Sequence, residues 1–339
     1  DKEDAYKHSK WLSSMEKRLK LAKNLLSDNG VIFISIDDTE MAQLKLLCDE
    51  IFGENNFIAN FIWKSRSSLQ YSEPLISSQT EYILTYAKNK NKWNNENGPT
   101  FSRIKKSTDK LNYSNPDNDK RGDWTSSGLI RDDGRKKYTI ITPSGKKYYE
   151  AWLYTEKNME KFREDGLLWF GKDGGAKPRK KSFWKDFEGK VSSNLLMDEF
   201  VYFENEDGSM EKKKLFEIGT TEKGTKELKE IFNVSRTPFD YPKPASLIEY
   251  LICLHPNKSC IVLDFFAGSG TTGHAVLELN KEDGGNRKFI LCTNNENNIC
   301  TDICYPRISK VIKGYTNIKN ENIEGLGGNL KYFKTSFVD

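Results

Sequence analysis

Residues 261–273 read Ile-Val-Leu-Asp-Phe-Phe-Ala-Gly-Ser-Gly-Thr-Thr-Gly, an apolar run that ends in an acid and a glycine-rich loop. A buried strand, a glycine loop and a following helix are typical of α/β proteins that bind a small cofactor at the start of the helix. The spacing Gly268-x-Gly270-x-x-Gly273 also matches the dinucleotide-binding fingerprint. The alternative is a strand-to-helix connection in which the glycines serve only packing.

The acid at the end of this strand narrows the choice of ligand. Asp264 is followed by Phe265, Phe266 and Ala267 before the first glycine, so the loop is longer than a tight phosphate-binding turn. A carboxylate repels a diphosphate and attracts cationic or hydroxyl-rich groups. The loop therefore favours a cofactor with such groups, and a dinucleotide-dependent oxidoreductase stays open as the alternative.

Apolar periodicity on both sides of a basic middle region predicts an α/β sheet. Residues 9–28 and 41–51 carry apolar positions at helical spacing, and the apolar run 31–36 is typical of a strand buried on both faces. Further strands are expected at 58–63, 81–87 and 288–292, and further helices at 226–232, 245–254, 276–279 and 303–312. The last of these helices, 303–312, is expected to expose Arg307 and Lys310. This alternation predicts a mostly parallel, doubly wound α/β sheet.

The middle of the chain has a different pattern. It contains short apolar runs at 138–142 and 199–203, many Asn, Asp and Gly turns, and little helical spacing. We expect an inserted, loop-rich α+β domain between two parts of the α/β domain. The expected boundaries are 1–88, 89–235 and 236–339.

The composition indicates a protein without a membrane span. The chain has 339 residues, 36% of them hydrophobic, and a mean hydropathy of −0.71. No apolar run approaches the roughly 20 residues that a span requires. The charged first residues do not resemble a signal peptide, so we expect a cytoplasmic location. Because the chain begins with Asp1 rather than Met, we interpret its start as trimmed.

Cysteine and histidine spacing gives no sign of a metal site. The six cysteines are scattered, and no histidine lies near Cys300 and Cys304, the closest pair. A zinc site would require a tighter cluster of these residue types. We therefore expect no metal, and free thiols in a reducing cytosol.

Positive charge is concentrated in the middle of the chain. Residues 90–190 hold 24 Lys and Arg against 15 Asp and Glu, a net charge of +9, together with five of the seven Trp residues. A basic, aromatic-rich block indicates a surface for a polyanion such as nucleic acid, although single lysines are more often simply solvated. The densest candidates for DNA contacts are Arg131, Arg135, Lys136, Lys137, Arg179, Lys180 and Lys181.

Three segments together resemble one protein family. Residues 263–272 and the segment Phe-Asp-Tyr-Pro-Lys-Pro at 239–244 are similar to the cofactor motifs of β-class DNA amino-methyltransferases, closest to the modification subunits of type III restriction–modification systems. Residues 11–57 are similar to the stretch that follows the catalytic motif of that family. The resemblance implies a Rossmann-like methyltransferase fold with permuted motif order, and an adenine-N6 methyltransferase of double-stranded DNA. It also implies a target-recognition domain at 89–235, and a homodimer and a restriction (helicase–nuclease) subunit as partners.

The resemblance implies S-adenosyl-L-methionine as the cofactor. Backbone N–H groups at the start of the helix after the loop would face its carboxylate, and Asp264 would accept from its ammonium group. Phe265 or Phe266 would pack against the sulfonium or the adenine, and Asn294 or Glu296 would hold the ribose hydroxyls. The implied cofactor residues are Asp264, Phe265, Phe266, Gly268, Ser269, Gly270, Thr271, Thr272, Asp240, Lys243, Asn294 and Glu296.

The catalytic motif of the family is missing from this sequence. That motif, Asp/Asn-Pro-Pro-Tyr/Phe, accepts the amino protons of the target base and stacks an aromatic ring on the flipped base. The sequence contains no Pro-Pro pair. The catalytic residues are therefore unknown, the motif is expected to precede Asp1, and the chain alone is expected to be inactive. A DNA-specificity module with a vestigial cofactor loop is a further alternative.

Overall fold

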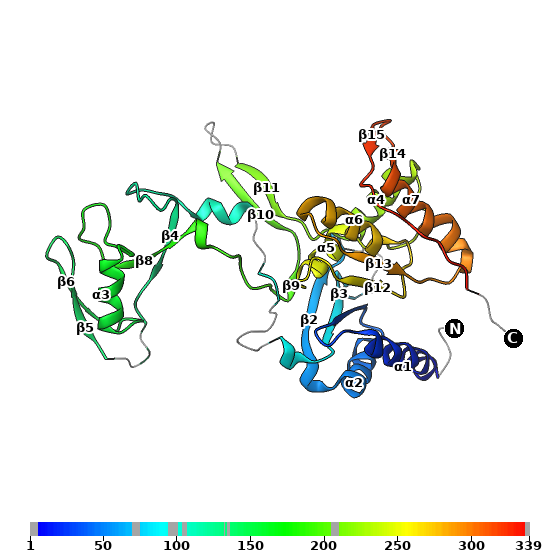
Figure 1. Cartoon of the computed structure of the whole chain (residues 1–339), viewed down its shortest axis with the longest axis horizontal. Helices are drawn as coiled ribbons and strands as arrows, with labels where there is room; N and C mark the ends of the chain where they lie inside the picture. Colours follow the sequence, from blue (N-terminus) through cyan, green and yellow to red (C-terminus); the bar gives the residue numbers. More distant parts are fainter. Residues whose placement is uncertain are drawn as a thin grey trace. The chain divides into compact units, whose positions relative to one another are not determined.

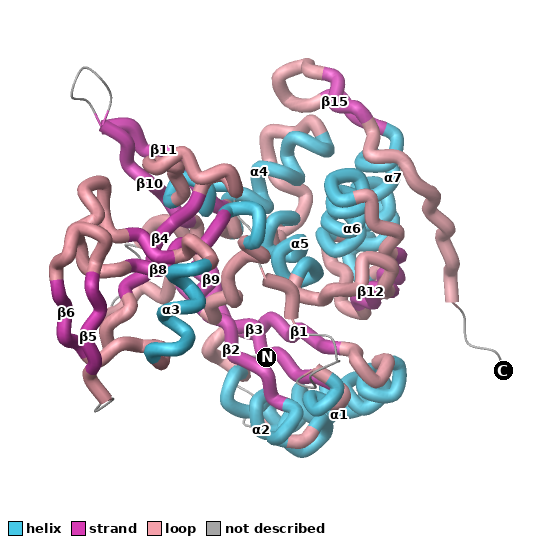
Figure 2. Tube along the Cα trace, turned by 60° about the vertical axis from the view of Figure 1, so that its left-hand side comes forward, coloured by secondary structure: helices cyan, strands magenta, loops and turns pink. Residues whose placement is uncertain are grey.

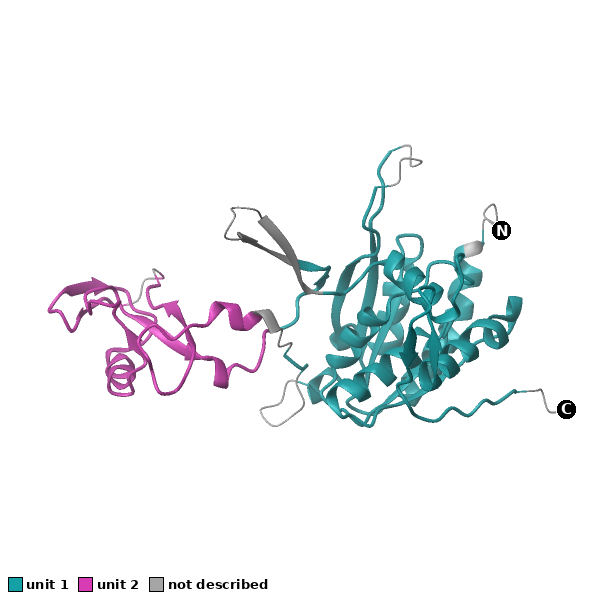
Figure 3. Cartoon of the chain, turned by 90° about the horizontal axis from the view of Figure 1, so that it is seen from above, with its two compact units in different colours: residues 1–103, 191–339 teal, residues 104–190 magenta. Residues whose placement is uncertain are grey.

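The structure is a computed structural model of the chain that describes residues 6–69, 75–93, 101–103, 107–131, 133, 136–204 and 210–335. It contains two compact units, coloured separately in Figure 3: unit 1 joins Asp1–Arg103 to Val191–Asp339, and unit 2 is Ile104–Lys190. Unit 2 is shorter than the expected insertion at 89–235. The segments on either side of it belong to unit 1 because they pair and pack with that unit.

The first part of unit 1 is a sheet covered by two helices. Its strand order is β1-β3-β2-β9, and β3 runs antiparallel to both β1 and β2, while the short β9 runs parallel to β2. In Figures 1 and 2, α1 and α2 lie together against these strands. Leu19 and Leu44 of the helices are fully buried with Leu84 of β3. The elements are α1 (Lys7–Leu25), β1 (Val31–Ile36), α2 (Met41–Phe52), β2 (Phe57–Lys64), β3 (Thr80–Ala87) and β9 (Leu195–Leu196).

The second part of unit 1 carries the glycine loop. β12 and β13 form a parallel pair in which Asp264 lies opposite Leu291, and α5 and α6 pack beside them around Ile252, Ala275 and Val276. The elements are α4 (Thr221–Phe232), α5 (Ala245–Cys253), β12 (Ile261–Asp264), α6 (Thr271–Asp283), β13 (Lys288–Leu291) and α7 (Tyr305–Lys313). A π-helical turn, η6 (Ile299–Cys304), leads into α7, and two hairpins complete the unit: β10 (Glu199–Glu204) with β11 (Met210–Phe216), and β14 (Gly314–Thr316) with β15 (Asn322–Glu324).

These elements confirm the α/β, Rossmann-like class and refine its strand directions. The predicted helices and strands are present, but the first sheet is mixed rather than mostly parallel because β3 is reversed between β1 and β2. The strand β1, expected to be buried on both faces, is only partly buried. Within the described residues it pairs along one edge only, with β3.

Unit 2 is a small α+β body with an aromatic core. Its sheet has the order β4-β8-β7, and a separate hairpin joins β5 to β6. Trp152 and Leu129 are almost fully buried with Met159 of α3. Trp124 is buried as well. Part of the aromatic content that suggested a binding surface therefore builds the core. The elements are β4 (Trp124–Gly128), β5 (Tyr138–Ile141), β6 (Lys147–Glu150), α3 (Glu156–Glu164), β7 (Leu168–Trp169) and β8 (Arg179–Phe183).

Short 3-10 helices complete the described elements. They are η1 (Glu54–Asn56), η2 (Lys90–Lys92), η3 (Ser107–Asn112), η4 (Trp184–Asp186) and η5 (Glu296–Asn298). Over the part of the chain that the structure describes, no helix combines the length and apolar character needed to cross a bilayer.

Candidate functional site

The glycine loop joins the carboxyl end of β12 to the first turn of α6. Gly270 precedes the helix with φ +81°, and a Cβ there would lie 3.1 Å from the Sγ of Cys304. At Gly273 a Cβ would lie 2.8 Å from the Cδ1 of Ile308, so glycine lets α6 approach α7 closely. The first N–H groups of a helix have no acceptor within it and carry partial positive charge. The loop thus presents donors suited to an anionic group such as a carboxylate.

Asp264 forms hydrogen bonds to both ends of this loop. One carboxylate oxygen accepts the backbone N–H of Phe266 at 3.0 Å, and the other accepts the hydroxyl of Thr272 at 2.6 Å. A carboxylate oxygen can accept more than one hydrogen bond, so Asp264 can brace the loop and still accept from a ligand. The structure thus gives Asp264 a positioning role that the sequence did not predict.

The segment 239–244 lies directly against the glycine loop, although 20 or more residues separate them in sequence. A Cβ at Gly268 would lie 3.3 Å from the Cζ of Phe239. The hydroxyl of Thr271 donates to the backbone carbonyl of Lys243 at 3.1 Å. The Lys243 ammonium forms an ion pair with Glu81 of β3 at 3.1 Å and lies 5.4 Å from the ring centroid of Trp63. The two segments that the sequence singled out therefore form one surface.

Arg307 lies beneath the loop, and the expectation that it is exposed is wrong. Its side chain is fully buried. One terminal nitrogen, Nη1, donates to Ser269 Oγ at 3.1 Å and to Thr271 Oγ1 at 2.8 Å. The other, Nη2, lies 3.1 Å from Nδ1 of His274. The hydroxyls of Ser269 and Thr271 are therefore turned inward by a buried cation, which leaves the backbone of the loop to meet a ligand. Lys310 is partly buried on the same helix.

Partly buried acids of the neighbouring helices accompany this cation. Glu227 Oε2 lies 3.6 Å from Arg307 Nη2 and accepts the N–H of Ala245 at 3.0 Å. Burial lowers the pKa of Arg307 to about 10, which still leaves it charged at neutral pH, and burial raises the pKa of Glu227. Burial and the neighbouring Glu278 raise the pKa of Glu249 to about 9. The helices under the loop thus hold a network in which Glu249 keeps a proton at neutral pH.

The remaining predicted cofactor residues lie at the surface of the same edge. Because β12 and β13 are parallel, their carboxyl ends meet at one edge of the sheet. Asn294 and Glu296 follow β13 and share a hydrogen bond of 3.1 Å. The rings of Phe265 and Phe266 lie 5.2 Å apart, and Phe266 is 58% exposed. Asp240 is also exposed.

The residues predicted to contact DNA in unit 2 differ in how exposed their side chains are and in the contacts they already make. Lys136 and Lys137 are exposed, and Arg131 is exposed beside Asp133, with 3.4 Å between Nε and Oδ2. Arg179 is exposed and donates from Nε to Ser126 Oγ at 2.8 Å. Lys180 is partly buried, with its ammonium 4.2 Å from the ring centroid of Phe162. Arg135 lies outside the described residues.

The prediction that Lys181 contacts DNA is wrong, because its side chain is buried. It is only 6% exposed, and its ammonium lies between the carboxylates of Asp117 and Asp119, the latter at 2.9 Å. The ring centroid of Trp124 lies 4.9 Å from the same ammonium. Because the ammonium of Lys181 is buried and already paired with two carboxylates, Lys181 is not free for a phosphate.

No group of three or more His, Cys, Asp and Glu side chains that could hold a metal occurs within the described residues.

The residue of the candidate site that the sequence did not predict is Arg307. A charged residue on an amphipathic helix is usually exposed, and no local pattern marked this one as buried.

The geometry described so far defines an α/β protein with a glycine loop, and a candidate site, at the carboxyl edge of its parallel strands. The chain belongs to the DNA methylase family, because the model of that family (N6_N4_Mtase) matches residues 1–303. The family-level resemblance inferred from the sequence is thereby confirmed.

Relatives come from two kinds of restriction–modification system. The chain is 39% identical over 293 residues to the type III StyLTI Mod subunit of Salmonella typhimurium, covering 84% of this chain and 41% of that protein. It is 32% identical over 352 residues to the type II methyltransferase M.KpnI of Klebsiella pneumoniae, covering 98% of this chain and 78% of that protein. The chain therefore spans less than half the length of the type III Mod subunit. Among solved structures, the M1.HpyAVI–SAM complex gives a TM-score of 0.36 at 15% identity over 86% of this chain and 81% of that one, a similarity too weak to define the fold.

Proposed function

We propose that this chain is the S-adenosylmethionine-binding and DNA-binding part of an adenine-N6 DNA methyltransferase of a type III restriction–modification system. The observation that carries the proposal is the glycine loop, braced from within by Asp264 and from below by Arg307. Membership in the DNA methylase family supports the same activity. We also propose a cytoplasmic location for the enzyme.

The loop residues fit S-adenosylmethionine by charge. The cofactor has a carboxylate for the N–H groups at the start of α6 and an ammonium group for Asp264. The exposed ring of Phe266 is suited to a sulfonium, and Asn294 and Glu296 are suited to ribose hydroxyls. When bound, the cofactor supplies an electrophilic methyl group. The loop binds and orients the cofactor, and Lys243 and Asp240 complete the surface beside it.

We propose unit 2 as the core of the target-recognition domain expected at 89–235. Its exposed Arg131, Lys136, Lys137 and Arg179 are suited to phosphate contacts, and Lys180 lies beside them in sequence. Such contacts supply much of the affinity of DNA-binding proteins and make it depend on salt. Arg135 belongs to the same basic stretch.

The catalytic group is proposed to come from outside this sequence. Methyl transfer to an exocyclic amine needs acceptors that hold its protons and an aromatic ring that stacks on the flipped base. No Pro-Pro pair occurs among the 339 residues. The chain is therefore proposed to bind both ligands without carrying out the transfer.

Calorimetric titration of the chain with S-adenosylmethionine and, separately, with NAD tests the proposal. The proposal is supported if the chain binds S-adenosylmethionine and does not bind NAD. Binding of NAD alone would instead favour the oxidoreductase. If the chain binds duplex DNA but neither S-adenosylmethionine nor NAD, the DNA-specificity module with a vestigial loop is favoured.

The type III assignment implies a homodimer and a restriction (helicase–nuclease) subunit as partners. The match to M.KpnI, which covers 98% of this chain, favours a type II methyltransferase as the second candidate. Light scattering of the purified chain distinguishes a dimer from a monomer. Copurification of a helicase–nuclease subunit from the native source supports the type III assignment, and its absence from an active enzyme favours the type II alternative.

A further inference from the structure

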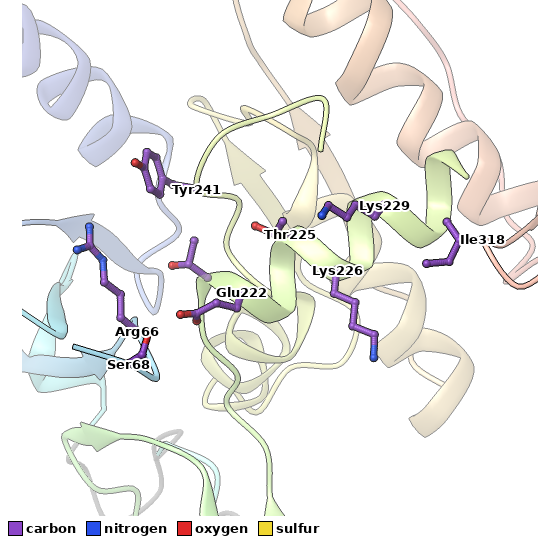
Figure 4. A pocket seen from close by; sticks show the side chains of 9 residues that line it. Arg66, Ser68, Glu222, Thr225, Lys226, Lys229, Tyr241 and Ile318 are labelled. Carbon is purple, nitrogen blue, oxygen red and sulfur yellow. The ribbon is translucent and has the colours of Figure 1, made fainter. Parts of the chain in front are cut away.

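A pocket in unit 1 is lined by Tyr241 of the segment 239–244 and by none of the residues of the glycine loop. It has a volume of about 480 Å³ and lies between the end of β2 and the helix α4. Figure 4 shows Arg66 and Ser68 on one side, and Glu222, Thr225, Lys226 and Lys229 of α4 on the other. A volume of this size lies within the range of ligand-binding pockets in proteins.

The walls of the pocket are held together by hydrogen bonds. The indole N–H of Trp63 in β2 donates to the carbonyl of Gly219 at 2.8 Å, and the N–H of Thr221 donates to the carbonyl of Ser65 at 2.9 Å. The hydroxyl of Ser67 donates to Glu222 Oε1 at 3.2 Å. The pocket is therefore a built feature of unit 1 rather than a gap between independent loops.

The charge of the pocket is positive. Arg66, Lys226 and Lys229 form no ion pair within the residues that the structure describes. Glu222 is the single acid in the lining, and one of its carboxylate oxygens accepts the hydroxyl of Ser67. Although burial acts to raise it, hydrogen bonds from Thr220 and Ser67 lower the pKa of Glu222. Three cations against one anion favour a negatively charged ligand.

Tyr241, which lines this pocket, has a strained backbone conformation. Its φ is +52°, a region that a bulky side chain rarely adopts, and its side chain is 75% exposed. Such strain is often retained where a side chain must be aimed at a ligand. Pro242 follows directly and restricts the conformation of the same turn. Tyr241 lines the pocket together with Ser68 and Thr225, which each carry a hydroxyl.

The cofactor does not suit this pocket. S-adenosylmethionine carries a sulfonium and an ammonium against one carboxylate, so its net charge is positive and the three cations of the lining repel it. A phosphodiester is anionic and accepts several hydrogen bonds, and it matches the arginine, lysines and hydroxyls of the lining.

We propose that this pocket holds a backbone phosphate of the substrate DNA, so that unit 1 grips the DNA independently of the basic residues of unit 2. The inference rests on the proposed DNA-binding function. Arg66 is the residue best suited to a two-pronged contact with phosphate oxygens, and Lys226 and Lys229 add point charges from the opposite side of the pocket.

The test compares two triple variants with equal loss of charge. The pocket variant is Arg66→Met/Lys226→Met/Lys229→Met. The control replaces exposed lysines of unit 1 that do not line the pocket, Lys288→Met/Lys313→Met/Lys331→Met. Fluorescence anisotropy of a labelled random-sequence duplex is measured over a series of salt concentrations, and thermal unfolding shows that both variants fold.

The pocket variant is expected to bind the duplex at least about fivefold more weakly than the control. Its slope of log K against log salt should be smaller by about one for each phosphate that the variant no longer binds. Equal binding by the two variants, with a wild type that binds DNA, overturns this inference and leaves the proposed function standing. A wild type that does not bind DNA overturns both.

A second arm separates DNA from free phosphate. The wild type and the pocket variant are titrated with inorganic phosphate by calorimetry. Pocket-dependent binding of inorganic phosphate with unchanged duplex affinity would identify a site for a small anion and overturn the proposal. Weaker duplex binding by the pocket variant, without measurable phosphate binding by the wild type, supports it.

Discussion

The guanidinium of Arg307 donates to the Thr271 hydroxyl at 2.8 Å, which ties α7 to the first residue of α6. The bond lies in the interior, because Arg307 is fully buried and Thr271 is 7% exposed. A buried charge is costly unless it is paired and hydrogen-bonded. Glu227, at 3.6 Å, provides the opposite charge. We infer that Arg307 acts through Thr271 and Ser269 as a positioning residue for the loop.

We expect Arg307→Lys to weaken S-adenosylmethionine binding by at least about tenfold. A lysine keeps the charge but cannot bridge Ser269 and Thr271 with a planar fork, and a hydrogen bond to a charged group contributes roughly 1.5–3 kcal/mol. Calorimetric titration measures the change. Lys313→Met, on the same helix and exposed, is the matched control and should bind normally.

A double-mutant cycle with Thr271→Val separates positioning from general destabilisation. If Arg307 acts through the Thr271 hydroxyl, the effects of the two substitutions on cofactor affinity should be less than additive. Fully additive losses, or a normal affinity of Arg307→Lys, would show that the loop does not depend on this contact.

We expect Asp264→Ala to abolish measurable cofactor binding and, with it, any effect of the cofactor on DNA affinity. The substitution removes the acceptor for the Phe266 N–H and the Thr272 hydroxyl as well as the acceptor proposed for the ligand. DNA anisotropy is measured with and without S-adenosylmethionine, and Asp302→Ala, an exposed acid, is the control. DNA binding that responds to the cofactor in neither the wild type nor the variant would support the vestigial-loop alternative.

The stability of unit 1 should fall as pH rises from about 5 to about 9. Burial and Glu278 raise the pKa of Glu249 to about 9 from its usual 4.5, so the folded state binds this proton more tightly than the unfolded state. The contribution is complete below the unfolded value and is lost as pH rises through the folded value. Each kcal/mol lost lowers Tm by about 2–4 °C for a domain of this size.

Glu249→Gln isolates this effect, because the amide imitates the protonated acid. Thermal unfolding of the variant should fall less steeply with pH than that of the wild type over the same range. Parallel pH profiles for the two proteins would show that Glu249 does not hold a proton in the folded state.

We expect Lys181→Met to destabilise unit 2 by about 1.5–3 kcal/mol, because the substitution removes the hydrogen bonds that the buried ammonium donates to the carboxylates of Asp117 and Asp119. Asp119 is the more buried partner, and the Arg121 guanidinium followed by Lys181 holds its pKa well below the usual range. Lys136→Met and Lys137→Met remove the same charge at exposed positions. These two variants should keep the wild-type Tm and weaken DNA binding, whereas a normal Tm for Lys181→Met would contradict its structural role.

Purified as this sequence, the chain should transfer no methyl group to DNA. The expectation follows from the absence of a Pro-Pro pair and therefore of the family's catalytic motif. Incorporation of tritiated methyl groups into duplex DNA measures the activity, and calorimetric cofactor binding in the same preparation shows that the chain is folded. Incorporation above background would require a catalytic group of a different kind from the family's motif.

Local sequence patterns were sufficient for the elements and for the position of the glycine loop. Helical spacing in α1 and α2, the apolar run of β1 and the strand-acid-glycine order at 261–273 predicted structure because each depends on neighbouring residues. The resemblance of 239–244 and 263–272 to one family also indicated that these two segments act together. The structure places them in contact.

Charged side chains were predicted less well, because the partner of a buried charge lies elsewhere in the chain. Arg307 and Lys181 both appeared solvated from their neighbours in sequence. Arg307 donates hydrogen bonds to residues 36 and 38 positions away, and Lys181 donates to acids 62 and 64 positions away. The reversal of β3 between β1 and β2 is likewise a matter of strand pairing that no single segment records.

The sequence alone thus determined which segments form helices and strands and where the glycine loop lies between them. Only the tertiary structure decided what supports that loop, because the network of Arg307, Glu227 and His274 forms when α4, α6 and α7 pack together. Periodicity records the apolar face of one element, whereas the free energy of a buried charge depends on every element around it.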